Sequence, residues 1–106
     1  MLIRVLAVFL LLALGSAAVA VAKPKMVRIG VADDVFKPAT RTVKKGTKLK
    51  FVWEGTDLHN VIASGAATAK SKLQKTGTLV FTAKRKGTIN LACEIHEDMV
   101  GTITVD

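Results

Sequence analysis

The residue types with the strongest coordination chemistry are also rare in this chain, which contains two histidines, one cysteine and three methionines. Cys93, His96 and Met99 follow one another at intervals of three residues, directly after an apolar segment. A tight loop with this spacing can turn three side chains toward one point. His59 follows another apolar segment through a short loop and can approach the same point from the neighbouring side. The pattern predicts one metal site built from these four residues.

The combination of donor atoms favours copper. One thiolate and two imidazoles, with a thioether as a weak axial ligand, form the trigonal site of copper proteins that transfer electrons. Structural zinc fits less well because it takes four strong tetrahedral ligands, and methionine is not a usual one. Catalytic zinc keeps an open position, which Met99 would fill. We therefore expect one copper ion bound by His59, Cys93, His96 and Met99.

Each of these residues also has an ordinary structural interpretation. A lone cysteine at the end of a strand, or a lone methionine after a loop, is usually a buried packing residue. An isolated exposed histidine usually has no function. Together these interpretations leave unexplained why both histidines and the single cysteine occur where ligands are needed. They also leave an unpaired thiol in an exported protein, where oxidising surroundings threaten it.

The first 22 residues are typical of an export signal. A short positively charged start precedes an apolar run, and Ala20–Ala22 fits the small-x-small cleavage pattern, so Lys23 is the expected mature N-terminus. An uncleaved membrane anchor is the alternative, although the 18 residues of 5–22 are at the lower limit for spanning a bilayer. We expect a signal peptide over residues 1–22, a domain over residues 23–106, and a periplasmic protein without stable membrane insertion.

Length and composition exclude several classes of protein. The chain has 106 residues, enough for one domain, and its single cysteine excludes a disulfide scaffold. Without the first 22 residues, 34 of 84 residues are apolar and the net charge falls from +8 to +7. That apolar content, in alternating segments, argues against intrinsic disorder. A domain of this size also buries too little surface to form a deep catalytic cleft.

Short alternating segments along residues 26–106 predict strands and no long helix. Leu49, Phe51 and Trp53 are expected to point into a core, while Lys48 and Lys50 face solvent. The small, polar and lysine-rich residues 63–76 give at most weak helical character. Strand-like segments at roughly 8–12 residue spacing predict an all-β antiparallel sandwich of about seven to eight short strands.

With these residues in place, the sequence resembles the small blue copper proteins, the cupredoxins of the plastocyanin, pseudoazurin and amicyanin type. The resemblance covers nearly all of residues 26–106, and the short Cys-x-x-His-x-x-Met loop is most similar to that of amicyanin. It implies a Greek-key β-sandwich and a type 1 copper site with the four ligands named above. The motifs that carry it are Phe36-x-Pro38, Val43-Lys-x-Gly46-x-x-Leu49-x-Phe51-x-Trp53, Asp57-x-His59-Asn60 and Cys93-x-x-His96-x-x-Met99-x-Gly101-x-Ile103-x-Val105.

The resemblance also implies roles for neighbours of the ligands. The side chain of Asn60 would tie the two ligand loops together, and its backbone N–H would point at the sulfur of Cys93. His96 would present a ring edge to solvent within an apolar patch. The sequence departs from the family at Ile95, where a proline is common, and at the acidic residues Glu94, Glu97 and Asp98. Ile95 retains a backbone N–H, which we expect to donate a second hydrogen bond to the thiolate.

These observations predict an exported mononuclear type 1 copper protein that carries single electrons between redox partners and is not an enzyme. A copper-binding or copper-delivery protein is the alternative. A copper enzyme for a small substrate is a third interpretation, and it would need an open coordination position.

The basic residues suggest what the protein meets. Lysines and arginines gather over residues 44–50 and 70–86, a composition that first suggests nucleic acid. An exported domain without an exposed aromatic platform makes that unsuitable, so we expect no nucleic acid. The charges either keep the surface solvated or steer the protein toward an acidic docking face on a redox partner, such as a periplasmic cytochrome or oxidoreductase. We expect a monomer, because a carrier must dock and leave.

Overall fold

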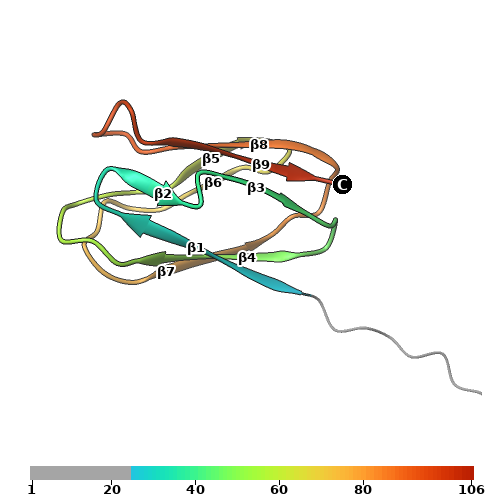
Figure 1. The fold of residues 1–106 in the computed structure, drawn as a ribbon, viewed down its shortest axis with the longest axis horizontal. Helices are drawn as coiled ribbons and strands as arrows, with labels where there is room; N and C mark the ends of the chain where they lie inside the picture. The colour runs from blue at the N-terminus through green and yellow to red at the C-terminus, as the bar shows by residue number, and fades with distance from the viewer. Residues whose placement is uncertain (1–24) are drawn as a thin grey trace, which may run out of the picture.

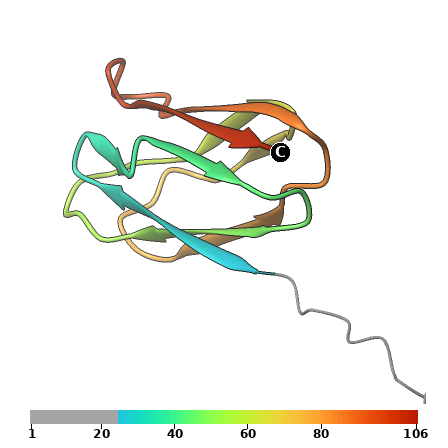
Figure 2. The same cartoon turned by 45° about the vertical axis from the view of Figure 1, so that its right-hand side comes forward.

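The computed structural model describes residues 25–106, which form two β-sheets packed face to face (Figures 1 and 2). The predicted signal peptide, residues 1–22, lies outside the described residues. The strands are β1 (Met26–Ala32), β2 (Val35–Lys37), β3 (Thr40–Val43), β4 (Lys48–Trp53), β5 (Ile62–Gly65), β6 (Ala69–Lys70), β7 (Thr78–Thr82), β8 (Gly87–Ala92) and β9 (Val100–Val105).

The two sheets have the strand orders β2-β1-β4-β7 and β3-β9-β8-β5-β6. The predicted all-β sandwich is confirmed. Its pairing is mixed, because β1 lies parallel to β4 and β3 lies parallel to β9. Alternation along a strand predicts which residues face the core, but it does not specify the neighbouring strand. The described residues form nine strands, more than the seven to eight expected. The strands β2 and β6 have only three and two residues, which is too short for an alternating pattern to reveal them in the sequence.

The core lies between the sheets. Leu49 and Phe51 of β4 are fully buried and Trp53 is 6% exposed, whereas Lys48 is exposed, as the alternation predicts. Phe51 stacks on Phe81 of β7 with ring centroids 5.5 Å apart. Each fully buried large apolar side chain contributes about 1.5–3 kcal/mol relative to an exposed one. This core fixes the strand ends from which the site loops emerge.

Residues 63–76 form short strands and a loop rather than a helix. Ser71 forms two hydrogen bonds of 2.9 Å with Val61, the residue before β5. Its N–H donates to the carbonyl of Val61, and its hydroxyl accepts from the N–H of Val61. Gln74 and His59 exchange two backbone hydrogen bonds of 3.0 Å. The segment therefore braces the stretch of chain that carries His59. Over residues 25–106, no helix is long and apolar enough to cross a membrane.

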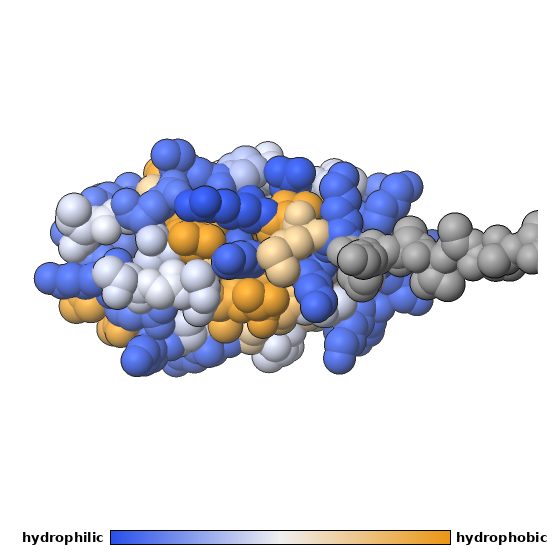
Figure 3. All heavy atoms as spheres, turned by 90° about the horizontal axis from the view of Figure 1, so that it is seen from below, coloured by the Kyte–Doolittle hydropathy of each residue, from blue (hydrophilic) through white to orange (hydrophobic). Residues whose placement is uncertain are grey.

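The loops divide between the two ends of the sandwich (Figure 1). The β1–β2 turn, the β4–β5 loop and the β8–β9 loop lie at one end, on the left of the view. The β3–β4 and β7–β8 turns lie at the other end beside the C-terminus, where the N–H of Gly46 donates to the carbonyl of Ala83 at 2.7 Å. The face drawn in Figure 3 carries mainly hydrophilic side chains, with apolar ones interspersed near its middle.

Candidate metal centre

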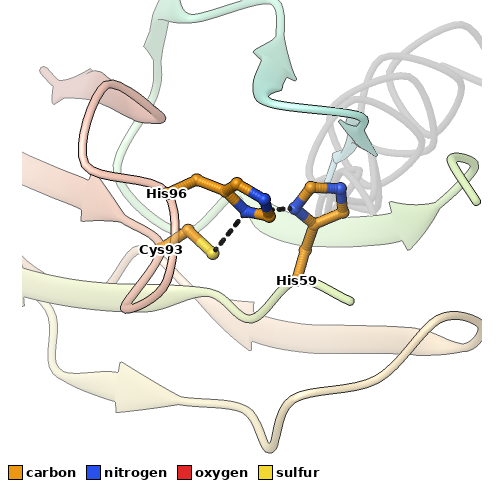
Figure 4. Close-up of side chains that lie close together, drawn as sticks. All are labelled: His59, Cys93 and His96. Carbon is orange, nitrogen blue, oxygen red and sulfur yellow. Dashed lines mark hydrogen bonds between the residues drawn. The ribbon is translucent and has the colours of Figure 1, made fainter. Parts of the chain in front are cut away.

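Two loops bring His59, Cys93 and His96 together at one end of the sandwich (Figure 4). His59 lies in the β4–β5 loop, Cys93 directly follows β8, and His96 lies three residues further along the β8–β9 loop. One nitrogen of each histidine and the sulfur of Cys93 all lie within 4.8 Å of one another. His59 is fully buried, whereas the side chain of His96 is 27% exposed. Three of the four predicted ligands thus converge, from positions 34 and 37 residues apart in the chain.

The distances suit a shared transition-metal ion. The two Nδ1 atoms are 3.1 Å apart, and the sulfur of Cys93 lies 3.7 Å from Nδ1 of His96. Donor atoms bound to one ion at about 2.0 Å (nitrogen) and about 2.3 Å (sulfur), with angles between tetrahedral and trigonal, lie about 3.2–3.8 Å apart. Both histidines present Nδ1 to the cluster, and these two distances are close to those between ligands of one ion. Copper ligation by these residues stays a prediction.

Met99 lies at the end of the same loop and is 1% exposed. Its N–H donates to the carbonyl of His96 at 3.0 Å, and its carbonyl accepts from the N–H of Cys93 at 3.2 Å. These two bonds close the loop over residues 93–99, so the three-residue spacing is held in one compact turn. The structure thus keeps Met99 beside the cluster, and its role as an axial ligand stays a prediction.

Asn60 ties the two ligand loops together, as the resemblance implied. Its side-chain carbonyl accepts from the N–H of Glu94 at 2.9 Å, and its amide donates to the carboxylate of Glu94, also at 2.9 Å. Asn60 is fully buried and follows His59, while Glu94 follows Cys93. This reciprocal pair of hydrogen bonds fixes the separation of the two loops. A metal site depends on such contacts, because they hold its ligands in position.

The Cys93 thiol is poised to form a thiolate. Burial raises the pKa of the Cys93 thiol, but hydrogen bonds from the backbone N–H groups of Asn60 and Ile95, and from His96, together outweigh it. The pKa therefore lies below its ordinary value. A thiolate is the form of cysteine that binds metals. The backbone N–H of Ile95 is among the groups that lower this pKa, in line with the expected donation, which stays a prediction.

The surroundings of His96 differ from the expected apolar patch. The exposed edge of its ring opens into a hollow lined by Asp34, Ile95, Glu97, Asp98 and Met99. Ile95 is 49% exposed and contributes apolar surface, but three carboxylic acids share the hollow with it. Asp34, Glu97 and Asp98 thus make the solvent-facing edge of the cluster polar and negatively charged.

Sequence reasoning missed Asp33 and Asp34 as partners of the two histidines. Asp33 accepts hydrogen bonds of 3.0 Å from the N–H groups of Thr56 and Asp57 and contacts Nε2 of His59 at 3.0 Å. These bonds, led by the one from Asp57, hold the pKa of the Asp33 carboxyl well below its usual range. The spacing along the chain contains no signal for this contact. Only the position of the β1–β2 turn at the same end of the sandwich reveals it.

Comparison with known proteins identifies the family to which this fold belongs. A family model described as a cupredoxin-like domain matches residues 4–105 of the chain. The chain belongs to the cupredoxin-like family. This family includes copper-binding electron-transfer proteins. No curated protein matches the chain.

Three solved structures illustrate the likeness. A purple cupredoxin from Nitrosopumilus maritimus is 17% identical, with a TM-score of 0.66, over 76% of this cupredoxin and 99% of that chain. A reduced amicyanin variant is 24% identical, with a TM-score of 0.66, over 81% and 86% of the two chains. Pseudoazurin from Hyphomicrobium denitrificans is 25% identical, with a TM-score of 0.65, over 76% and 74%. These likenesses support the cupredoxin fold of residues 25–106.

Proposed function

We propose that this cupredoxin is an exported electron carrier with one type 1 copper ion bound by His59, Cys93, His96 and Met99. The observation that carries the proposal is the convergence of His59, Cys93 and His96, whose facing donor atoms lie 3.1 and 3.7 Å apart. A thiolate with two imidazoles and a thioether is the donor set of electron-transfer copper. Copper in such a site supplies a one-electron Cu(II)/Cu(I) couple.

The residues around the cluster restrict the motion of its side chains, which suits electron transfer. His59 and Met99 are buried, and the Asn60–Glu94 pair holds the loops at a fixed separation. A site that is rigid in both oxidation states spends little energy on rearrangement when the electron moves. His96 alone among the three clustered residues exposes a substantial part of its ring, so it offers the route by which an electron enters and leaves.

The proposal also covers the type of protein, its location and its partner. A closed donor set without an open coordination position favours a carrier over an enzyme. The carrier would work as a periplasmic monomer after removal of residues 1–22, and would exchange electrons with a periplasmic redox protein such as a cytochrome or an oxidoreductase. Copper delivery is the competing function, and it differs in what the site does after binding the metal.

Voltammetry of the copper-loaded protein tests the proposal. An electron carrier gives a reversible one-electron wave and rapid self-exchange between Cu(I) and Cu(II) molecules, seen as broadening of NMR signals in a mixture of the two. Cys93→Ser provides the control, because it removes the thiolate and leaves both histidines in place. An irreversible wave with slow self-exchange, from a protein that still binds copper tightly, would favour copper delivery.

A further inference from the structure

The β1–β2 turn presents two consecutive carboxylates to the two histidines of the cluster. Oδ1 of Asp33 lies 3.0 Å from Nε2 of His59, and Oδ1 of Asp34 lies 3.2 Å from Nε2 of His96. The opposite ring nitrogens, both Nδ1, face each other at 3.1 Å. Each imidazole is thus held between a carboxylate on one side and the proposed metal position on the other.

The local backbone makes this double contact possible. Asp34 has a φ of 64°, in the left-handed region that aspartate and asparagine adopt more readily than most residues. The chain reverses there, so that one turn serves two histidines from different loops. The carboxylate of Asp33 is also fixed by the N–H groups of Thr56 and Asp57, which belong to the loop that carries His59. Its contact with His59 is therefore well defined.

A carboxylate bound to one ring nitrogen decides what the other nitrogen can do. A neutral imidazole carries its proton on only one nitrogen, so a proton held on Nε2 by a carboxylate leaves the Nδ1 lone pair free for a metal. The carboxylate also makes the imidazole a stronger donor. Stronger donation and added negative charge both stabilise Cu(II) relative to Cu(I).

We propose that Asp33 and Asp34 are positioning residues that hold His59 and His96 with the proton on Nε2 and Nδ1 toward the metal, and that they lower the reduction potential of the site. The copper potential rests on the proposed function, whereas the orientation of the rings applies to any metal bound there. The two contacts differ in exposure, since the Asp34 side chain is 65% exposed and that of Asp33 is 39% exposed. Solvent screening should make the contribution of Asp34 to the potential the smaller one.

The variants are Asp33→Asn and Asp34→Asn, with Asp98→Asn as the matched control. Asp98 is exposed on the loop of His96, and within residues 25–106 its side chain has no hydrogen bond or ion pair in the structure. Asp98→Asn therefore removes the same charge without removing a contact to an imidazole. Asp57 is unsuitable as a control, because its carboxylate lies within 4.8 Å of ring nitrogens of His59 and His96.

The first readout uses Zn(II) as the probe, so it does not depend on copper chemistry. In the Zn(II)-loaded full chain, NMR of the imidazole nitrogens should show the proton of both histidines on Nε2. Asp33→Asn should speed exchange of the His59 proton alone, and Asp34→Asn that of the His96 proton alone. Each should weaken Zn(II) binding by about 10- to 100-fold, the usual cost of losing such a partner. Asp98→Asn should change neither property.

The second readout is the reduction potential of the copper-loaded proteins, which should rise in both variants and more in Asp33→Asn. Asp33→Asn also loosens the loop of His59, so Asp34→Asn is the decisive variant. Within residues 25–106, the side chain of Asp34 makes its one ion pair with His96. Asp34→Glu, which keeps the carboxylate, should restore part of the Zn(II) affinity.

Two results would overturn the proposal. One is protons on Nδ1 of the histidines, and the other is an Asp34→Asn protein that matches Asp98→Asn in both Zn(II) affinity and proton exchange. Absence of a reversible copper couple alone would overturn the proposed function and leave the Zn(II) result standing.

Discussion

The sulfur of Cys93 is the residue-scale feature that most directly sets the electronic character of the proposed site. Hydrogen bonds from the backbone N–H groups of Asn60, Ile95 and His96, and from the His96 ring, lower the pKa of the Cys93 thiol. Hydrogen bonds to a thiolate withdraw electron density from the sulfur. Donation to copper weakens as a result, which stabilises Cu(I) relative to Cu(II). The carboxylates of Asp33 and Asp34 act in the opposite direction through the histidines, so the potential reflects a balance of both effects.

Ile95→Pro tests the sulfur side of that balance. Proline has no N–H, so the substitution removes one of the three backbone donors that lower the pKa of Cys93. The reduction potential should fall, as measured by voltammetry of the copper-loaded protein. Ile95→Ala is the matched control, because it shortens the same exposed side chain and keeps the N–H. Equal potentials in the proline and alanine variants would show that the N–H of residue 95 has no part in tuning the sulfur.

The sequence identified the convergent residues but not the groups behind the histidines. Cys93 and His96 could be predicted because rare donor types at short spacing lie on one loop. Asp33 and Asp34 lie 26 and 62 residues before their histidines, and consecutive aspartates are ordinary in turns. Their role depends on the three-dimensional position of the turn, which residue spacing does not specify.

At the scale of elements, the site depends on the contact that holds the β4–β5 loop against the β8–β9 loop. Asn60 and Glu94 form the reciprocal contact between them. Because Asn60 is fully buried, loss of its side chain leaves the N–H of Glu94 without its acceptor. A polar group that loses its partner inside a protein costs more than the bond itself contributed.

Asn60→Ala should therefore lower the free energy of unfolding by about 1–3 kcal/mol, as measured by urea denaturation of the metal-free protein. It should also weaken metal binding, because the loops lose their fixed separation. Asn90→Ala provides the comparison, since Asn90 is an exposed asparagine of β8. A stability of Asn60→Ala within a few tenths of a kcal/mol of Asn90→Ala would contradict the structural role assigned to Asn60.

The strands show which parts of the fold a sequence can specify. The alternation of Leu49, Phe51 and Trp53 with lysines predicted the buried face of β4 correctly, because solvation acts on each residue separately. The parallel pairing of β1 with β4 was not predictable in this way, since it depends on where the chain returns after crossing between sheets. Residues 63–76 form β5, β6 and a loop through backbone contacts with distant residues, which local composition does not encode.

At the scale of the whole molecule, charge is distributed unevenly along the sandwich. The loops at the site end contain seven of the chain's eight acidic residues, whereas the turns at the opposite end contain a group of basic residues. The acidic residues are Asp33, Asp34, Glu54, Asp57, Glu94, Glu97 and Asp98, and the basic ones are Lys44, Lys45, Lys84, Arg85 and Lys86. The expected steering toward an acidic partner would act through the end of the molecule remote from His96.

This polarity predicts how reagents of known charge oxidise the reduced protein. At an ionic strength of about 0.15 M the screening length is about 8 Å, so charges beside His96 should outweigh the distant lysines. The rate with a cationic cobalt(III) complex should fall as salt is added, while the rate with anionic ferricyanide should rise. Stopped-flow absorption measures both rates.

Paired variants locate the charges responsible. Glu97→Gln with Asp98→Asn should flatten the salt dependence, whereas Lys84→Gln with Lys86→Gln should leave it nearly unchanged. If only the lysine variants altered the salt dependence, the basic end would be the one that steers redox reagents. That result would favour the expected acidic docking face on the partner.

The most direct test of the central claim is a visible absorption spectrum of the purified metal-free protein titrated with Cu(II). The proposed site predicts an intense thiolate-to-copper charge-transfer band that saturates at one copper per chain and bleaches with a mild reductant. The band should vanish in Cys93→Ser. A titration that yields only the faint absorption of ordinary Cu(II), with the same spectrum in Cys93→Ser, would show that Cys93 is not a ligand and would contradict the electron-carrier function.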